Sequence, residues 1–113
     1  MSRDGYLEVD TGGQYPATVA EIGNYTHNCG RMWHTAVAAV SDLPDLDATG
    51  GMTGSQAAPV LARAATYMAL HPDEFRPMNP QNGWGDYESA RDYLWRAATL
   101  CAEHPKARVR WSV

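Results

Sequence analysis

The spacing of apolar residues predicts two strands near the start of the chain and one at its end. Apolar and polar residues alternate in residues 6–10, a pattern typical of a half-buried strand. A glycine-rich turn at residues 11–14 and a second apolar stretch at 17–22 follow, so we expect a hairpin. Residues 108–113 alternate again, and we expect this last strand to pair with the hairpin.

Three stretches between these strands carry helical spacing. Apolar residues in 28–40 recur at positions i, i+4 and i+8, which places them on one helical face. A second helix is expected from Thr53, where a glutamine three residues later completes a capping box, to His71, which precedes a proline. The third is expected to begin after Asp86, a good N-cap, and to end at His104, again before a proline.

The element order β-β-α-α-α-β predicts a single α+β domain over residues 1–113. A small antiparallel sheet, made of the N-terminal hairpin and the C-terminal strand, would pack on three amphipathic helices. Residues 23–26 interrupt the alternation, so the second strand is expected to end before them. Residues 72–85 are expected to form a long loop. An all-helical bundle with extended ends is the alternative architecture.

Composition narrows the function classes. The chain has 113 residues, is 44% hydrophobic and only 19% charged, which favours a folded protein with one core. The net charge of −4 argues against a general nucleic-acid binder. No apolar run approaches the roughly 20 residues of a membrane span. Two cysteines and the absence of an apolar leader predict a cytoplasmic protein with reduced thiols.

The candidate binding site comes from the segments before the first and third helices. Residues 79–87 hold a tryptophan between two glycines, a costly arrangement for a solvated connector. Helix N-termini carry unpaired amides and attract anions, so two such ends at one edge would form a polar pocket. The predicted ligand-binding residues are Asn24, Tyr25, Thr26, Asn28, Arg31, Arg76, Asn79, Asn82, Trp84 and Asp86. The alternative is that the asparagines only cap helices while Trp84 fills the core.

Metal and cofactor chemistry is less well supported. Zinc-type ligands lie near the first helix and in the third, at His27, Cys29, His34, Cys101 and His104. Cys29 and His34 are five residues apart, a spacing at which two side chains point away from each other on a helix. We therefore expect no metal site. The chain has no dinucleotide fingerprint, no phosphate-binding glycine loop with lysine and no nucleophile elbow, so no cofactor and no catalytic residue are predicted.

Two motifs of this chain resemble a known family. The segment G-N-Y-T-x-N at 23–28 and the segment N-P-x-N-G-W-G-D-Y at 79–87 are similar to those of small uncharacterised bacterial and bacteriophage proteins. The resemblance covers residues 21–113. It implies that both asparagine-bearing segments belong to a shared pattern, in which the positions of His27 and Cys29 are not fixed. The family has no assigned activity, and a phage setting implies an accessory role such as countering host defence.

These observations predict a non-enzymatic protein that binds a small anionic or nucleotide-like molecule. A homo-oligomer would suit this function, because subunit interfaces bury small ligands well. A protein-interaction or self-assembly module that uses exposed Trp84, Trp95 and Trp111 is the first alternative. A small hydrolase or transferase that uses Asp86 or Glu88 as a general acid or base is the second.

Overall fold

The computed structural model describes residues 2–113, with the backbone alone at His27. Three strands and four α-helices follow one another along this part of the chain. Their bounds are β1 Ser2–Val9, β2 Ala17–Thr26, α1 Gly30–Val40, α2 Gly54–Leu70, α3 Pro72–Phe75, α4 Tyr87–Glu103 and β3 Arg108–Ser112. Short 3-10 turns precede α1 (His27–Cys29), precede α2 (Asp47–Thr49) and follow α3 (Arg76–Met78).

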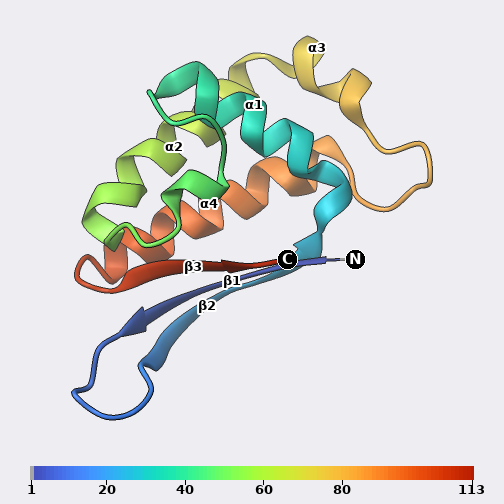
Figure 1. The fold of residues 1–113 in the computed structure, drawn as a ribbon. Coiled ribbons are helices and arrows are strands. Elements are labelled where there is room, and N and C mark those ends of the chain that lie inside the picture. The colour runs from blue at the N-terminus through green and yellow to red at the C-terminus, as the bar shows by residue number, and fades with distance from the viewer. Residues whose placement is uncertain (1) are drawn as a thin grey trace.

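The protein has two layers, with the sheet on one side and the helices on the other (Figure 1), so the predicted α+β class is confirmed. Helices α2 and α4 run antiparallel, in contact along their length. At one end the Tyr87 hydroxyl donates to the Met68 carbonyl. At the other end Gly54 allows close approach, because a Cβ there would lie 2.3 Å from the carbonyl oxygens of Cys101 and His104.

The predicted pairing of the last strand is also confirmed. The sheet has the order β2-β1-β3, and both neighbours run antiparallel to the central β1. Leu7 of β1 lies opposite Val109 of β3, and both are fully buried under the helices. Successive residues of a strand face opposite sides of the sheet. Arg3, Gly5 and Leu7 of β1 therefore face this core, and the residues between them face away from it.

The prediction that the second strand ends before residue 23 is wrong. β2 continues to Thr26, and residues 23–26 lie opposite residues 2–5 of β1. The pairing shifts between Gly5 and Tyr6, and Gly23 adopts a φ of 107°. A bulge inserts one residue and reverses the alternation without ending the strand. Asn24, Tyr25 and Thr26 are therefore strand residues rather than loop residues.

The helix count was also predicted incorrectly, since residues 2–113 contain four α-helices and not three. The additional helix, α3, is a single turn within the expected loop of residues 72–85. Pro72 is its first residue, where the missing N–H and the fixed φ of proline favour a helix start. The first long helix also begins at Gly30, after a 3-10 turn, and not at residue 28.

The predicted helix caps are present. Thr53 and Gln56 form both hydrogen bonds of a capping box at the start of α2. The Asp86 side chain accepts the Ser89 N–H at the start of α4, at 2.8 Å. The α-helices α2 and α4 end immediately before His71 and His104, as expected from the prolines that follow.

Candidate functional site

The two asparagine-bearing segments lie in contact. The last residues of the loop before α4 lie against the end of β2 and the start of α1, while the rest of this loop projects from the body of the molecule (Figure 1). The Asp86 amide donates to the Tyr25 hydroxyl at 3.2 Å. A Cβ at Gly85 would lie 2.6 Å from Cγ2 of Thr26 and 2.8 Å from Sγ of Cys29, so the contact is tightly packed. The fold thus joins segments about sixty residues apart at one edge of the molecule.

Two backbone amides at the start of α4 are already bonded to side chains of the protein. The Tyr87 N–H donates to Oδ1 of Asn79 at 2.9 Å, and the Ser89 N–H donates to Oδ1 of Asp86 at 2.8 Å. The Asp86 carboxylate also adds negative charge to this helix end. The Tyr87 and Ser89 amides are therefore already occupied, and side chains are the better candidates for recognising an anion here.

The loop of residues 79–85 presents hydrogen-bond donors to solvent around an exposed indole. Trp84 is 68% exposed, so it does not fill the core. Its backbone N–H donates to Oδ1 of Asn82 at 2.9 Å. Because Asn79 and Asn82 both use their oxygens to accept backbone N–H groups, their exposed side chains retain the amide NH2 groups as donors. The nearby Arg76 guanidinium lies over the Tyr87 ring, 5.4 Å from its centroid.

The carboxylates near this loop have structural partners. Glu88 pairs with Arg76 at 3.4 Å between Oε1 and NH2, in an exposed ion pair. Asp86 caps α4 with Oδ1, as described above. An acid–base pair would require two carboxyl groups aimed at a common space, but these two are oriented by a guanidinium and a helix end.

The other predicted site residues have different surroundings. Asn24 lies on the far side of β2, where its amide donates to Oγ of Ser2 and Oδ1 of Asp4. Asn28 donates from Nδ2 to Oγ1 of Thr26 at 2.8 Å. Arg31 is exposed in the first turn of α1. Asn24 is thus directed away from the loop, whereas Thr26 and Tyr25 contact it.

Tyr25 connects the loop to the aromatic part of the core. Its ring centroid lies 5.7 Å from that of Trp33 and 5.6 Å from that of Tyr93. Burial raises the pKa of the Tyr25 hydroxyl, while the hydrogen bond from the Asp86 amide acts in the opposite direction. The hydroxyl stays protonated at neutral pH, so it accepts the amide without placing a negative charge beside Asp86.

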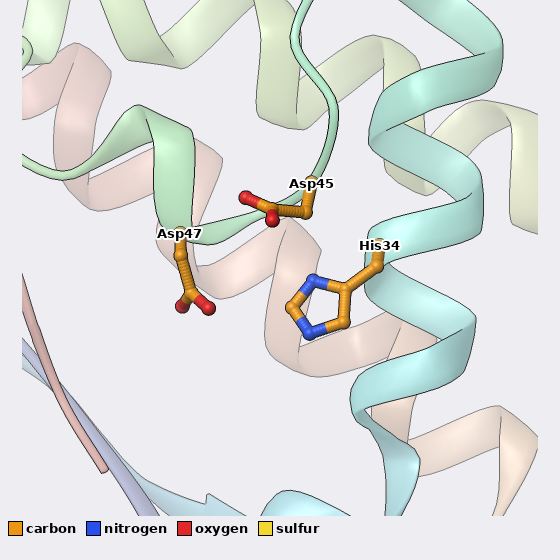
Figure 2. A group of neighbouring side chains, drawn as sticks. All are labelled: His34, Asp45 and Asp47. Carbon is orange, nitrogen blue, oxygen red and sulfur yellow. The ribbon is translucent and has the colours of Figure 1, made fainter.

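A separate group of possible metal ligands comprises His34, Asp45 and Asp47 (Figure 2). One ligand atom from each lies within 4.8 Å of the others. However, the Leu46 amide donates to Nδ1 of His34 at 3.1 Å. A neutral imidazole that accepts at Nδ1 carries its proton on Nε2, so it offers no lone pair there for a metal. Metal-bound histidines ordinarily donate from their second nitrogen, the reverse of this arrangement.

The two carboxylates of this group are engaged as well. Oδ1 of Asp45 accepts the Ala48 N–H at 2.9 Å, and Oδ1 of Asp47 pairs with NH1 of Arg3 at 2.6 Å. The group therefore ties the connector between α1 and α2 to β1 and to α1. Of the zinc-type ligands considered from the sequence, Cys29 and Cys101 are buried free thiols, and the His27 side chain lies outside the described residues.

Arg3 is an important residue that the sequence patterns missed. It is only 3% exposed, and its guanidinium carbon lies 5.7 Å from the Trp33 ring centroid and 5.4 Å from that of Trp111. Its Nε has no hydrogen-bond partner among the described residues. Arg3 is two and four residues from Gly5 and Leu7, and this alternation could have placed it on the buried face of the strand. It was missed because the strand was expected to begin only at residue 6.

Comparison of the chain with protein-family models, curated proteins and solved structures finds no match. Within residues 2–113, no helix is both long and apolar enough to cross a membrane.

Proposed function

We propose that this protein binds a small, nucleotide-like anion at the loop of residues 79–85 without transforming it. The observation that carries the proposal is Trp84, which is 68% exposed although both ends of its loop are anchored, at Asn79 and at Gly85. A large apolar side chain that stays in water does not contribute the roughly 1.5–3 kcal/mol of stability that its burial would give. Stacking a base on an aromatic ring recovers about 1–3 kcal/mol, which gives the exposed indole a function.

The ligand class follows from the polar side chains of the loop of residues 79–85 and from Arg76, which precedes it. The free side-chain groups of Asn79 and Asn82 are amide donors, and Arg76 adds a cationic donor 58% exposed at its side chain. Donors of this kind complement the oxygens of phosphate or carboxylate groups and the acceptor edges of a heterocycle. The contact of Gly85 with Thr26 and Cys29 fixes the end of the loop next to Trp84, so less ordering is required there on binding.

Intrinsic fluorescence titrated with nucleoside mono-, di- and triphosphates and cyclic nucleotides tests the proposal. We expect a saturable change in the native protein, and we expect Trp84→Ala to remove the change and to weaken binding in calorimetry by about tenfold or more. Trp95→Ala is the matched control, because Trp95 is also an exposed tryptophan but lies on α4, away from the loop of residues 79–85 and beside a hollow between α2 and α4. A response that is lost in Trp95→Ala and kept in Trp84→Ala would refute the assignment.

The resemblance to small phage proteins suggests that such binding serves to sequester a host nucleotide. Sequestration requires stoichiometric capture and slow release, without turnover. A ligand returned chemically unchanged after prolonged incubation would support this role. Turnover that disappears in Asp86→Asn with binding retained would instead identify an enzyme.

A second candidate function is a protein-interaction module. Trp95 is 40% exposed beside an apolar hollow of about 350 Å³ between α2 and α4. Alanines from both helices, with Pro59 and Thr99, form most of its lining. Exposed tryptophan beside an apolar groove is typical of interfaces. Light scattering that shows an oligomer in the native protein and a monomer in Trp95→Ala would favour this function.

A further inference from the structure

The helices leave the outer face of the sheet open in Figure 1. On this face, acidic and basic side chains lie on different strands. The register places Glu21 of β2, Tyr6 of β1 and Arg110 of β3 in one row. The next row contains Thr18, Glu8 and Arg108. Cations therefore gather at the β3 edge of this face, although the whole chain has a net charge of −4.

These cations line a hollow at the base of the β1–β2 hairpin. The hollow has a volume of about 660 Å³, within the range of about 300–1,000 Å³ that is usual for small-molecule sites. Lys106, Arg108 and Arg110 form one wall, and the hairpin residues Gly13 and Gln14 belong to the other. Three of the nine basic residues of the chain thus converge on one space.

The carboxylates that also line the hollow have partners within the protein. Glu8 accepts from Nε of Arg110 at 2.6 Å, and Asp10 accepts the Gly12 amide at 2.8 Å. Lys106 has no carboxylate within ion-pair distance among the ion pairs of residues 2–113. With three cations against two carboxylates, the hollow retains a positive charge centred near Lys106.

The two arginines are already oriented. Arg108 donates from NH1 to the Gly51 carbonyl at 2.7 Å, and Arg110 uses only Nε on Glu8. A guanidinium has five N–H donors, so each arginine retains others beyond the hydrogen bond that it forms within residues 2–113. Fixed guanidinium groups lose less conformational entropy when they bind a tetrahedral oxyanion than freely moving ones do.

We propose that the hollow beside Lys106, Arg108 and Arg110 binds a phosphate group, either free or as a phosphomonoester. This site is separate from the loop that carries Trp84. The hollow lies at the hairpin end of β2, whereas the loop contacts the opposite end of the same ten-residue strand. At about 3.3 Å per residue the two places lie roughly 30 Å apart.

A titration by ¹H–¹⁵N NMR at constant ionic strength tests the proposal with inorganic phosphate and with phenyl phosphate. We expect saturable shifts of the Arg108 and Arg110 Nε–H signals and of the backbone amides of residues 10–15 and 106–110. Lys106→Gln should weaken binding about tenfold, the loss of one charge-assisted contact. Arg63→Gln, which removes an exposed cation on α2, and Trp84→Ala should leave the affinity unchanged.

The outcomes separate the possible sources of the ligand. Saturation with both probes identifies recognition of the phosphate group itself, and saturation with only one probe identifies its source. The two arginines also bind groups of the protein itself, Arg108 the Gly51 carbonyl and Arg110 the Glu8 carboxylate. If that is their whole role, neither probe will saturate, or Lys106→Gln will respond like the native protein, and the proposal is then wrong. Retained signal dispersion in Lys106→Gln shows that the variant is folded.

Discussion

Replacing Gly85 with alanine tests whether close packing holds the Trp84 loop against β2 and α1. Gly85 has a φ of 98°, and a Cβ there would lie 2.6 Å from Cγ2 of Thr26 and 2.8 Å from Sγ of Cys29. Backbone strain at such an angle costs about 1–3 kcal/mol, and over-packing adds about 1–3 kcal/mol. We therefore expect Gly85→Ala to lower the free energy of unfolding by about 2–6 kcal/mol.

Gly83→Ala provides a matched control in the same loop. Gly83 also has a positive φ, 77°, but a Cβ there meets no heavy atom within 4 Å among the described residues. It should cost only the left-handed backbone penalty of about 1–2 kcal/mol. Urea unfolding followed by far-UV circular dichroism measures both variants, with an unchanged m-value as the check on two-state behaviour.

The difference between the two variants isolates the packing contribution. If Gly85→Ala and Gly83→Ala destabilise the protein equally, the contact of residue 85 with Thr26 and Cys29 does not exist in solution. The proposed binding site would then lack its fixed geometry. A larger loss in Gly85→Ala that also reduces the affinity of the folded variant for nucleotides would connect loop packing with binding.

Three further predictions concern stability. Thr53→Ala should lower the free energy of unfolding by about 1 kcal/mol through loss of the α2 cap, whereas Thr66→Ala, on the exposed side of the same helix, should change it by under about 0.5 kcal/mol in urea unfolding. Asp47→Ala leaves the buried Arg3 guanidinium unpaired and should lower the free energy of unfolding by about 3 kcal/mol in the same assay. Arg3→Met should cost less, because it leaves only a half-exposed carboxylate unpaired. Equal losses in the two variants would contradict this explanation. Burial raises the pKa of the Cys101 thiol from 9.0 to about 11, so its stabilising contribution is complete below pH 9 and is lost as the pH rises to 11. Chemical unfolding measures the free energy of unfolding across this range. Between pH 9 and pH 11 it should fall by about 3 kcal/mol less in Cys101→Ala than in the native protein.

Local signals in the sequence were sufficient for most of the helical boundaries. The capping box at Thr53 and the N-cap at Asp86 act within three residues, so they are readable without a fold. The prolines after His71 and His104 end two helices for equally local reasons. The bulge at Gly23 is different, because only pairing with β1 shows that an interrupted alternation continues as a strand.

The candidate site could be predicted only in part. The sequence identified the loop of residues 79–85 as unusual and associated it with residues 24–28, and these segments do lie in contact at Tyr25 and Thr26, with Cys29 beside them. It did not show that Asn24 faces the other side of the sheet. The bulge preceding Asn24 shifts the register, and a shift of one residue reverses which face a side chain occupies.

By itself, the sequence determined the α+β class, the order of the long elements and the caps that start α2 and α4, because propensity, periodicity and capping act over a few neighbouring residues. Only the tertiary structure decided that Arg3 is buried between Trp33 and Trp111 while Trp84 remains exposed. Burial depends on which distant segments cover a position. The α1–α2 connector and β3 enclose Arg3, whereas Trp84, between two glycines of positive φ, stays 68% exposed.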